Sequence, residues 1–213
     1  MNILDGLVQS PGETTLGFDI NAVLTPSAAA EFFDEGYRFC LRYLSRGAER
    51  DTDLSYGEAC DILSAGLALM PVQHVAQSPW LPTAELGQEY GSAAAVNAGN
   101  VGFPAGVNVW CDLEGCADAS QEDVVAYCKA WWSAVSGAGY VPGLYVGAQA
   151  GLSGLSLYEE LPFQHYWQSE SSVPVVATRG YQMIQKSGGP LIDKNSTQAD
   201  NEGGQVLWLA PNP

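Results

Sequence analysis

VNVWCDLE, residues 107–114, is the stretch that best indicates the fold of this 213-residue chain. It is mostly apolar until its end, which is typical of a strand buried on both faces, as in a parallel sheet. Residues 120–136 follow with a helical pattern that places Val124, Cys128 and Trp131 on one apolar face. A buried strand followed by an amphipathic helix is the repeating unit of α/β proteins. The stretch therefore predicts a parallel sheet covered by helices.

The same alternation extends along the chain in both directions. Expected strands cover residues 16–21, 38–44, 67–75, 107–113, 141–147, 164–168, 180–184 and 191–195, and expected helices cover 26–35, 56–65, 83–99 and 120–136. Strands that alternate with helices form βαβ units, and eight strand candidates within one domain favour closure into a barrel. We therefore predict one α/β domain over residues 16–213, a (β/α)8 TIM-like barrel with irregular last strands. An N-terminal arm over residues 1–15 precedes it.

Polar and aromatic side chains stand at the carboxyl end of almost every predicted strand. Functional residues of parallel α/β folds gather at these ends. The side chains concerned are Asp19, Arg42, Tyr43, His74, Asp112, Glu114, Tyr145, Trp167, Gln182, Gln185, Asp193 and Asn195. Because only 15% of the residues are charged, this gathering predicts a single site at one end of the barrel.

Asp112 and Glu114 form the centre of the predicted site. Side chains two apart on a strand share a face, about 6.6 to 6.8 Å apart along the backbone. Two carboxyls that face one pocket raise each other's pKa, and the less solvated one can stay protonated near neutral pH. A glycosidase needs an acid that protonates the leaving oxygen and a charge that stabilises an oxocarbenium-like transition state. Glu114 has the longer reach and is the candidate acid, and Asp112 is the candidate stabiliser. The alternative is that both are solvated residues of a turn.

These short motifs together resemble those of a known family. GFD at 17–19, LRYL at 41–44, DLE at 112–114, GLY at 143–145 and DKN at 193–195 stand in the matching order. On them the chain resembles the glycoside hydrolase family 25 lysozymes, and more closely the bacterial glycoside-hydrolase-like domain of unknown function related to them. The resemblance covers about residues 16 to 200.

The resemblance implies roles for individual side chains. In the lysozyme family the Glu of the pair is taken as the proton donor, a role that falls on Glu114. The Asp, here Asp112, orients the substrate's acetamido group or stabilises the intermediate. The resemblance further implies that Asp19 and Asp193 shape the site and that aromatic residues, here Tyr145 and Trp167, line the sugar groove. The family's substrate is the β-1,4 bond between N-acetylmuramic acid and N-acetylglucosamine in peptidoglycan.

A second family of sugar-cleaving barrels, the family 18 chitinases, also ends its fourth strand in DxE. Its DxxDxDxE motif requires Asp at positions 107 and 110, where this chain has Val107 and Trp110. The sequence therefore argues against a chitinase.

His74, Gln182 and Arg42 complete the expected substrate-binding set. His74 ends a predicted strand and Gln182 lies on another. Arg42 either reaches into the pocket or pairs with a carboxylate. Its neighbours Leu41 and Tyr43 point to the opposite face of the strand. Either Arg42 or this pair must therefore face the helices, and the sequence leaves open which of the two does.

Other chemistries are less well supported by the residues present. A cluster of Asp19, Asp112, Glu114 and Asp193 would suit a hard cation, which is an alternative to a sugar site. No HExxH, P-loop or GxGxxG motif occurs, and no GxSxG motif accompanies the two histidines. We therefore expect neither a metal nor a cofactor.

The net charge of −16 limits the classes of partner. Such a chain repels phosphate backbones and anionic lipids, which argues against nucleic acid and membrane partners. No window approaches the roughly 20 apolar residues of a membrane span. The five cysteines, an odd number without metal-ligand spacing, indicate small buried residues of a reduced, cytosolic chain.

Residues 1–8 contain Asp5 and no basic residue, unlike a signal peptide. We expect synthesis in the cytoplasm, followed by export through a non-classical route or release by phage lysis. A delivery machinery or an immunity protein is the matching partner.

Three hypotheses follow from the sequence. The first is a muramidase-like hydrolase of peptidoglycan or a related N-acetylated glycan, with Glu114 as general acid and Asp112 as stabiliser. The second is the same barrel binding a glycan without cutting it. The third is a scaffold barrel in a phage or secretion-system assembly.

Overall fold

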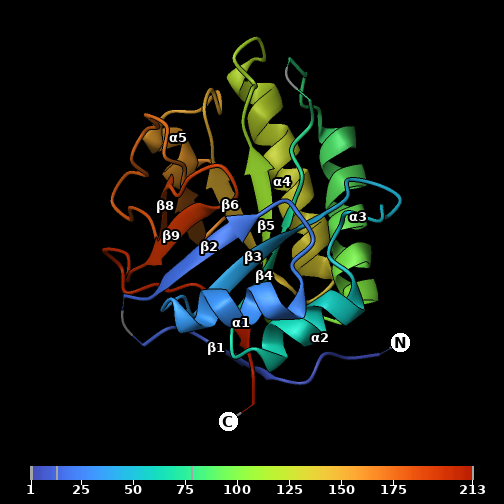
Figure 1. The fold of residues 1–213 in the computed structure, drawn as a ribbon. Coiled ribbons are helices and arrows are strands. Elements are labelled where there is room, and N and C mark those ends of the chain that lie inside the picture. Colours follow the sequence, from blue (N-terminus) through green and yellow to red (C-terminus); the bar gives the residue numbers. More distant parts are fainter. Residues whose placement is uncertain (1, 13, 78, 213) are drawn as a thin grey trace.

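The computed structural model describes residues 2–12, 14–77 and 79–212 (Figure 1). Within these residues the centre of the molecule is a closed barrel of eight strands. They are β2 (Leu16–Ile20), β3 (Phe39–Leu44), β4 (Ala68–Gln73), β5 (Asn108–Leu113), β6 (Val141–Val146), β7 (His165–Gln168), β8 (Met183–Ser187) and β9 (Asp193–Thr197). Strands β2 to β8 pair in parallel, and β9 closes the barrel by pairing antiparallel with both β8 and β2.

Helices follow the first five barrel strands and cover the outside of the barrel. They are α1 (Pro26–Asp34), α2 (Tyr56–Ser64), α3 (Ala84–Val101), α4 (Gln121–Gly137) and α5 (Gly154–Glu159). Each begins after a Ser or Thr whose side chain accepts a hydrogen bond from a backbone N–H of the first turn. Figure 1 shows α3 and α4 packed side by side along one flank.

The closed α/β barrel confirms the predicted fold class, but the regular (β/α)8 pattern is not confirmed. In the part of the chain that the structure describes, residues 169–182 and 188–192 connect the last barrel strands without a helix. The irregularity expected for the last strands takes the form of the antiparallel β9. A strand that returns through a hairpin needs no crossover helix.

Two further short strands extend the sheet beside β4, at the end of the barrel where the parallel strands begin. β1 (Leu7–Gln9) pairs antiparallel with β10 (Trp208–Ala210), and β10 pairs with β4. Barrel strands β4 and β5 pair only where the last two residues of β4 meet Trp110 and Cys111 in the middle of β5. The segment before β10 contacts the opposite side of this seam, because the Leu207 carbonyl accepts from the Asn108 amide at 2.8 Å. The sequence reasoning missed β1, α5 and β10. The division at residue 15 stays a prediction.

The barrel interior is a packed core rather than a channel, as expected for a barrel of this size. It holds the large side chains Phe39, Leu41, Met70, Trp110, Trp167, Met183 and Trp208. Two glycines make room for them. A Cβ atom at Gly17 would lie 2.4 Å from the Phe39 ring, and a Cβ at Gly143 would lie 2.4 Å from the Trp110 ring. These side chains fill the barrel from the end where the parallel strands begin. Polar side chains occupy the opposite end, where the parallel strands finish.

No helix in the described part of the chain combines the length and apolarity needed to cross a membrane. All five cysteines are unpaired thiols, and all except the half-buried Cys60 are buried.

Candidate active site

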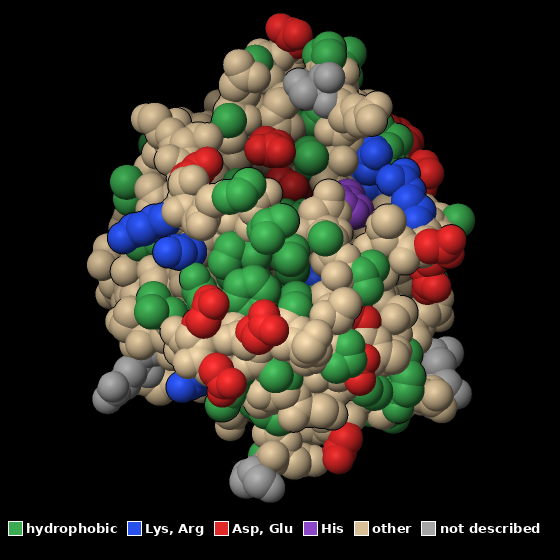
Figure 2. Space-filling model, in the orientation of Figure 1, with side chains coloured by type: hydrophobic (Ala, Val, Ile, Leu, Met, Phe, Trp, Pro, Cys, Tyr) green, Lys and Arg blue, Asp and Glu red, His purple; other side chains and the backbone are tan. Residues whose placement is uncertain are grey.

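A cavity of about 250 Å³ lies at the carboxyl ends of the parallel strands. It is lined by Tyr43, Asp112, Glu114, Tyr145, Trp167, Glu170, Ser171, Gln185 and Asp193. Most of these residues occupy inward-facing positions, since alternate side chains of a strand share a face. Asp112 lies two residues beyond the interior Trp110 and is in register with Tyr145, which is in register with Trp167. Figure 2 shows acidic side chains recessed in a hollow above the centre of this face, with apolar surface below.

Asp19 lies beneath the cavity and is almost fully buried, at 4% exposure. Its Oδ2 accepts from Gln185 Nε2 at 2.9 Å and from Asn195 Nδ2 at 2.7 Å, and its Oδ1 accepts from the Tyr43 hydroxyl at 3.2 Å. Burial raises the pKa of Asp19 to about 6, and the charge of Asp193 adds to the rise, against the opposing effect of the three hydrogen bonds. Asp19 therefore joins the walls of the cavity from below.

Asp112 is half-buried, and its Oδ1 is a buried oxygen without a hydrogen-bond partner among the described residues. Burial raises the pKa of Asp112 well above its ordinary value, and the negative charges of Glu114 and Asp19 raise it further. The backbone N–H of Val75 opposes this rise. A buried acidic oxygen without a partner is rare in folded proteins, and here it belongs to a residue that lines the cavity.

Glu114 is also half-buried, and burial raises the pKa of its carboxyl. Its backbone carbonyl accepts from the Trp80 indole at 2.8 Å, which fixes the chain just after β5. Gly147 lies against it, since a Cβ there would be 2.6 Å from Glu114 Cβ and 2.7 Å from Oε2. The two carboxyls thus share a site in which both resist ionisation, the condition expected for a general acid near neutral pH.

Aromatic residues and amides tie the cavity walls together. Asn195 accepts from the Trp167 indole at 2.8 Å while it donates to Asp19. Gln185 accepts from the Tyr145 hydroxyl at 2.9 Å while it also donates to Asp19. The rings of Tyr145 and Trp167 meet edge to face, with centroids 4.5 Å apart. The network holds the aromatic rings rigidly, which suits a surface that orients a bound sugar.

A family model matches residues 30–206, most of the chain, and its description is "Rv2525c-like, glycoside hydrolase-like domain". The chain belongs to this family. Comparison with curated proteins gives no match. The predicted resemblance is thereby confirmed, and the glycoside hydrolase-like domain has a barrel with an acidic cavity at the expected end.

Solved structures share the fold at low sequence identity. The Mycobacterium tuberculosis Tat-secreted protein Rv2525c, in complex with L-tartrate, is 17% identical with a TM-score of 0.63, over 87% of this chain and 95% of that one. A muramidase from Trichobolus zukalii is 14% identical with a TM-score of 0.63, over 86% and 93%. A family 25 glycosyl hydrolase from Bacillus anthracis is 14% identical with a TM-score of 0.58, over 91% and 93%. At these identities the similarity shows the fold alone.

The cavity of this glycoside hydrolase-like domain brings together most of the predicted site residues. Asp112, Glu114, Tyr145, Trp167 and Asp193 line it, and Asp19 bonds to its walls. Whether these residues act on a substrate stays a prediction.

Besides Asp19, which lies beneath the cavity, three residues of the predicted substrate-binding set do not line it. Arg42 is fully buried and faces the helices. Its Nε donates to Glu58 at 2.6 Å, and its other nitrogens donate to Glu58 and to backbone carbonyls. Its placement in the pocket is therefore corrected, because a buried arginine already saturated with acceptors has no donor left for a sugar.

Gln182 is likewise fully buried outside the cavity. It precedes β8, accepts from the Tyr166 amide and donates to the Gln164 carbonyl and to Asp200. His74 lies behind the wall, stacked on Tyr43 with ring centroids 4.6 Å apart and 3.5 Å from a carboxylate oxygen of Asp53. Burial lowers the pKa of His74. It supports a lining residue instead of lining the cavity itself.

The expected set omitted Tyr43, Glu170, Ser171, Gln185 and Asn195. Tyr43, Gln185 and Asn195 stood among the strand-end residues, so the alternation of faces could have selected them once Asp19 was placed inward. Glu170 and Ser171 follow β7 in an irregular segment that no periodicity marks.

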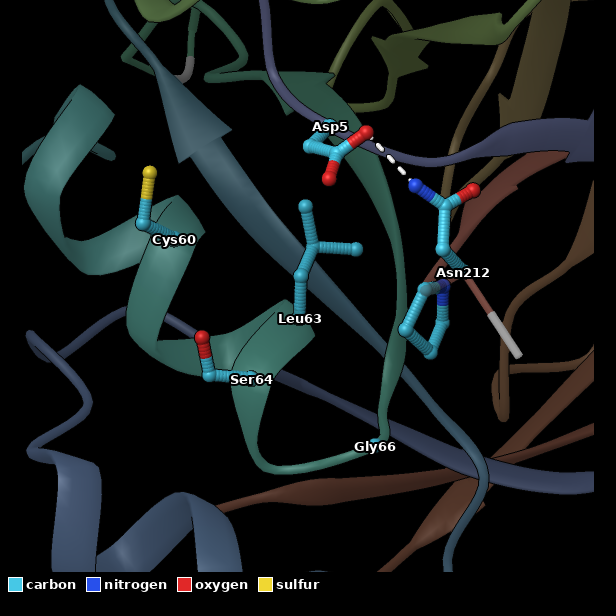
Figure 3. A pocket seen from close by; sticks show the side chains of 7 residues that line it. Asp5, Cys60, Leu63, Ser64, Gly66 and Asn212 are labelled. Carbon is cyan, nitrogen blue, oxygen red and sulfur yellow. Dashed lines mark hydrogen bonds between the residues drawn. The ribbon is translucent and has the colours of Figure 1, made fainter.

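Other groupings in the described residues carry less chemistry. No group of three or more His, Cys, Asp or Glu residues among them has the geometry to hold a metal ion. A second cavity, of about 390 Å³, lies near the opposite end of the barrel between the N-terminal arm and α2 (Figure 3). Among the described residues that line it, Asp5 provides the one carboxyl, which accepts from Asn212 at 2.6 Å, and none has an aromatic ring.

Proposed function

We propose that this domain is a muramidase-like glycoside hydrolase that cleaves peptidoglycan or a related N-acetylated glycan. The observation that carries the proposal is the pair Asp112 and Glu114, which line one cavity with aromatic walls and have raised pKa values. Membership in a glycoside hydrolase-like family and the shared fold with muramidases support the same reaction class.

Glu114 is the general acid of the proposed reaction. Because burial raises its pKa, its carboxyl holds a proton at a pH where an exposed glutamate would have lost it. It gives that proton to the glycosidic oxygen as the bond to the anomeric carbon breaks. A water molecule then adds hydroxide to that carbon and returns a proton to Glu114, so that the acid is restored.

Asp112 stabilises the positive charge that develops on the sugar. As a residue that lines the cavity, its carboxylate can accept a hydrogen bond from the substrate's acetamido N–H or face the positive charge at the anomeric carbon. Because burial and the charges of Glu114 and Asp19 raise the pKa of Asp112, the two carboxyls titrate as a pair, and a proton can reside on either of them. A substrate that moves this proton to Glu114 leaves Asp112 negative where the charge is needed.

The size of the cavity suits a single sugar ring. Its volume of about 250 Å³ lies just below the range of about 300 to 1,000 Å³ that is usual for ligand pockets. Carboxyl and hydroxyl groups and the Gln185 amide make up most of its exposed lining, because the Trp167 ring is almost fully buried, at 1% exposure. Such a polar lining matches the hydroxyl and amide groups of an N-acetylated hexose.

The test is hydrolysis of purified peptidoglycan, with the released fragments identified by mass. Glu114→Gln keeps the shape of the side chain but removes its acid, and we expect a rate loss of about a hundredfold or more. Glu89→Gln, an exposed position on α3, is the matched control and should keep the rate of the unaltered protein. Equal turnover by the Glu114→Gln variant and the control would remove Glu114 from the mechanism.

The small, tightly bonded cavity also suits a domain that binds a glycan without cutting it. Asp19 accepts hydrogen bonds from both Gln185 and Asn195, and side chains held by such bonds form the walls of a preformed binding site. In that case neither the unaltered protein nor the Glu114→Gln variant releases fragments, while both bind the glycan in sedimentation assays.

A further inference from the structure

A groove of about 320 Å³ lies beside the cavity and shares Glu114 with it. Its lining comes from the segments that follow β4, β5 and β6, namely Val75, Ala76, Gln77, Glu114, Gly115, Ala148 and Gln149. Among the described residues, Glu114 is the one lining residue common to both spaces. The proposed acid therefore stands at the boundary between two compartments.

The chemistry of the groove differs from that of the cavity. Among the described residues of its lining, Glu114 is the one with a charged side chain, and the others include the small apolar residues Val75, Ala76 and Ala148 and the amides of Gln77 and Gln149. Apolar surface beside amide donors and acceptors fits a neutral sugar ring, which has an apolar face and hydroxyl groups at its edge. With a volume similar to that of the cavity, the groove also has room for one such ring.

The wall that carries Gln149 is held in an unusual backbone conformation. Gln149 has φ of +57°, which only glycine adopts without cost. Hydrogen bonds hold the turn, since the Gly115 amide donates to the Ala148 carbonyl at 2.9 Å and the Cys116 amide donates to the Gln149 carbonyl at 2.8 Å. A glutamine where glycine would be less strained is typical of a position kept for its side chain.

We propose that this groove binds the sugar on the leaving side of the scissile bond, a proposal that rests on the proposed function. The sugar that reacts occupies the cavity with Asp112, and its neighbour occupies the groove against Gln149 and Gln77. The glycosidic oxygen that joins them then lies at Glu114, where the proton is delivered. The substrate class that follows is an N-acetylated glycan that continues beyond the cleaved bond, with Gln149 as a specificity residue for its leaving half.

The experiment compares two substrates that differ only on the leaving side. One is a tetrasaccharide of alternating N-acetylglucosamine and N-acetylmuramic acid. The other is the fluoride of the corresponding disaccharide, whose leaving group is a single atom and leaves the groove empty. Gln149→Gly removes the side chain and suits the left-handed backbone. Thr178→Gly, at the other described non-glycine position with positive φ, is the matched control outside both spaces.

We expect Gln149→Gly to lower kcat/KM for the tetrasaccharide by about 3- to 10-fold, the effect of one lost hydrogen bond, and to leave the fluoride unaffected. Gln77→Ala should lower kcat/KM for the tetrasaccharide in the same selective way, and Thr178→Gly should leave kcat/KM unchanged for both substrates. The groove assignment would be overturned if Gln149→Gly lowered kcat/KM equally for both substrates, or did not lower it for the tetrasaccharide. In either case, turnover of the fluoride by the unaltered protein would still support the proposed function. Absence of turnover on both substrates by the unaltered protein would overturn the proposed function, and the groove assignment with it.

Discussion

Replacing the buried Asp19 by asparagine should make the protein more stable at alkaline pH and weaken the dependence of its stability on pH. The side chain is 4% exposed, and its pKa rises from 3.8 to about 6 in the folded protein, chiefly because burial disfavours the charged form. A tenfold difference in proton affinity between the folded and unfolded states corresponds to about 1.36 kcal/mol. The carboxylate therefore lowers the free energy of unfolding above pH 6 by about 3 kcal/mol, relative to pH values below 4.

The direction follows from proton binding. Between about pH 4 and 6 the folded state holds the proton on Asp19 more tightly than the unfolded state does, so stability decreases as the pH rises through this window. Asparagine has no proton to lose and can keep all three hydrogen bonds. Its oxygen accepts from Gln185 and Asn195, and its amide donates to the Tyr43 hydroxyl, which can act as an acceptor.

The assay is urea unfolding of the unaltered protein and the Asp19→Asn variant at pH 5 and pH 8. We expect the variant to be more stable at pH 8, by an amount that approaches 3 kcal/mol, and the gap to shrink at pH 5. Asp51→Asn, at an exposed turn, is the matched control and should not reproduce the gap. A variant that is less stable than the unaltered protein at pH 8, or a gap that does not change with pH, would refute the reasoning.

Two further substitutions test the packing around the site. Gly147→Ala places a methyl group within 2.7 Å of the Glu114 carboxylate. We expect the free energy of unfolding, measured in urea, to fall by about 1–3 kcal/mol. Because a shift of about 1 Å in a catalytic group costs about a hundredfold in rate, the rate of glycan hydrolysis should fall by a similar factor. Gly137→Ala, which meets no atom within 4 Å, should keep both properties, and an unimpaired Gly147→Ala variant would contradict the proposed placement of Glu114. Arg42→Met leaves Glu58 buried without its partner, and urea unfolding should show a loss of about 3–5 kcal/mol; a loss below about 1 kcal/mol would show that the ion pair is not needed.

The sequence was most informative where one pattern dominated. Residues 107–114 carry a mostly apolar run that ends in two carboxyls, and this pattern is typical of a buried strand with a polar carboxyl end. The barrel and the meeting of Asp112 and Glu114 with Tyr145 and Trp167 in one cavity could therefore be predicted. These residues share a simple origin, because each stands at or just beyond the carboxyl end of a parallel strand.

Asp193 reaches the cavity by a different route from the predicted one. The sequence reasoning placed it at the end of a parallel strand over residues 191–195. In the structure it begins β9, which runs antiparallel, so that the start of this strand lies at the cavity. Composition alone does not give the direction of a short strand, and here either direction brings the same carboxyl to the same end.

Arg42 and Gln182 show why the rest of the site could not be predicted. On a strand, a shift of one position moves a side chain to the opposite face, and Tyr43 rather than Arg42 faces inward. The partner that keeps Arg42 outside is Glu58 on α2, 16 residues away. For Gln182, the observed strand begins at Met183 rather than near residue 180, so that Gln185 lines the cavity in its place.

The antiparallel course of β9 bears on how this barrel diversifies. A parallel eighth strand would begin at the far end and would need a long crossover, whereas β8 and β9 are joined by residues 188–192 alone, directly at the entrance to the cavity. Leu191 at this hairpin tip is 77% exposed. Doubling the length of a flexible loop costs only about 0.6 kcal/mol, so insertions here alter what enters the site while the barrel and its carboxyl pair stay as they are. The hairpin tip is thus the place where related chains can acquire new ligand preferences at little cost to folding.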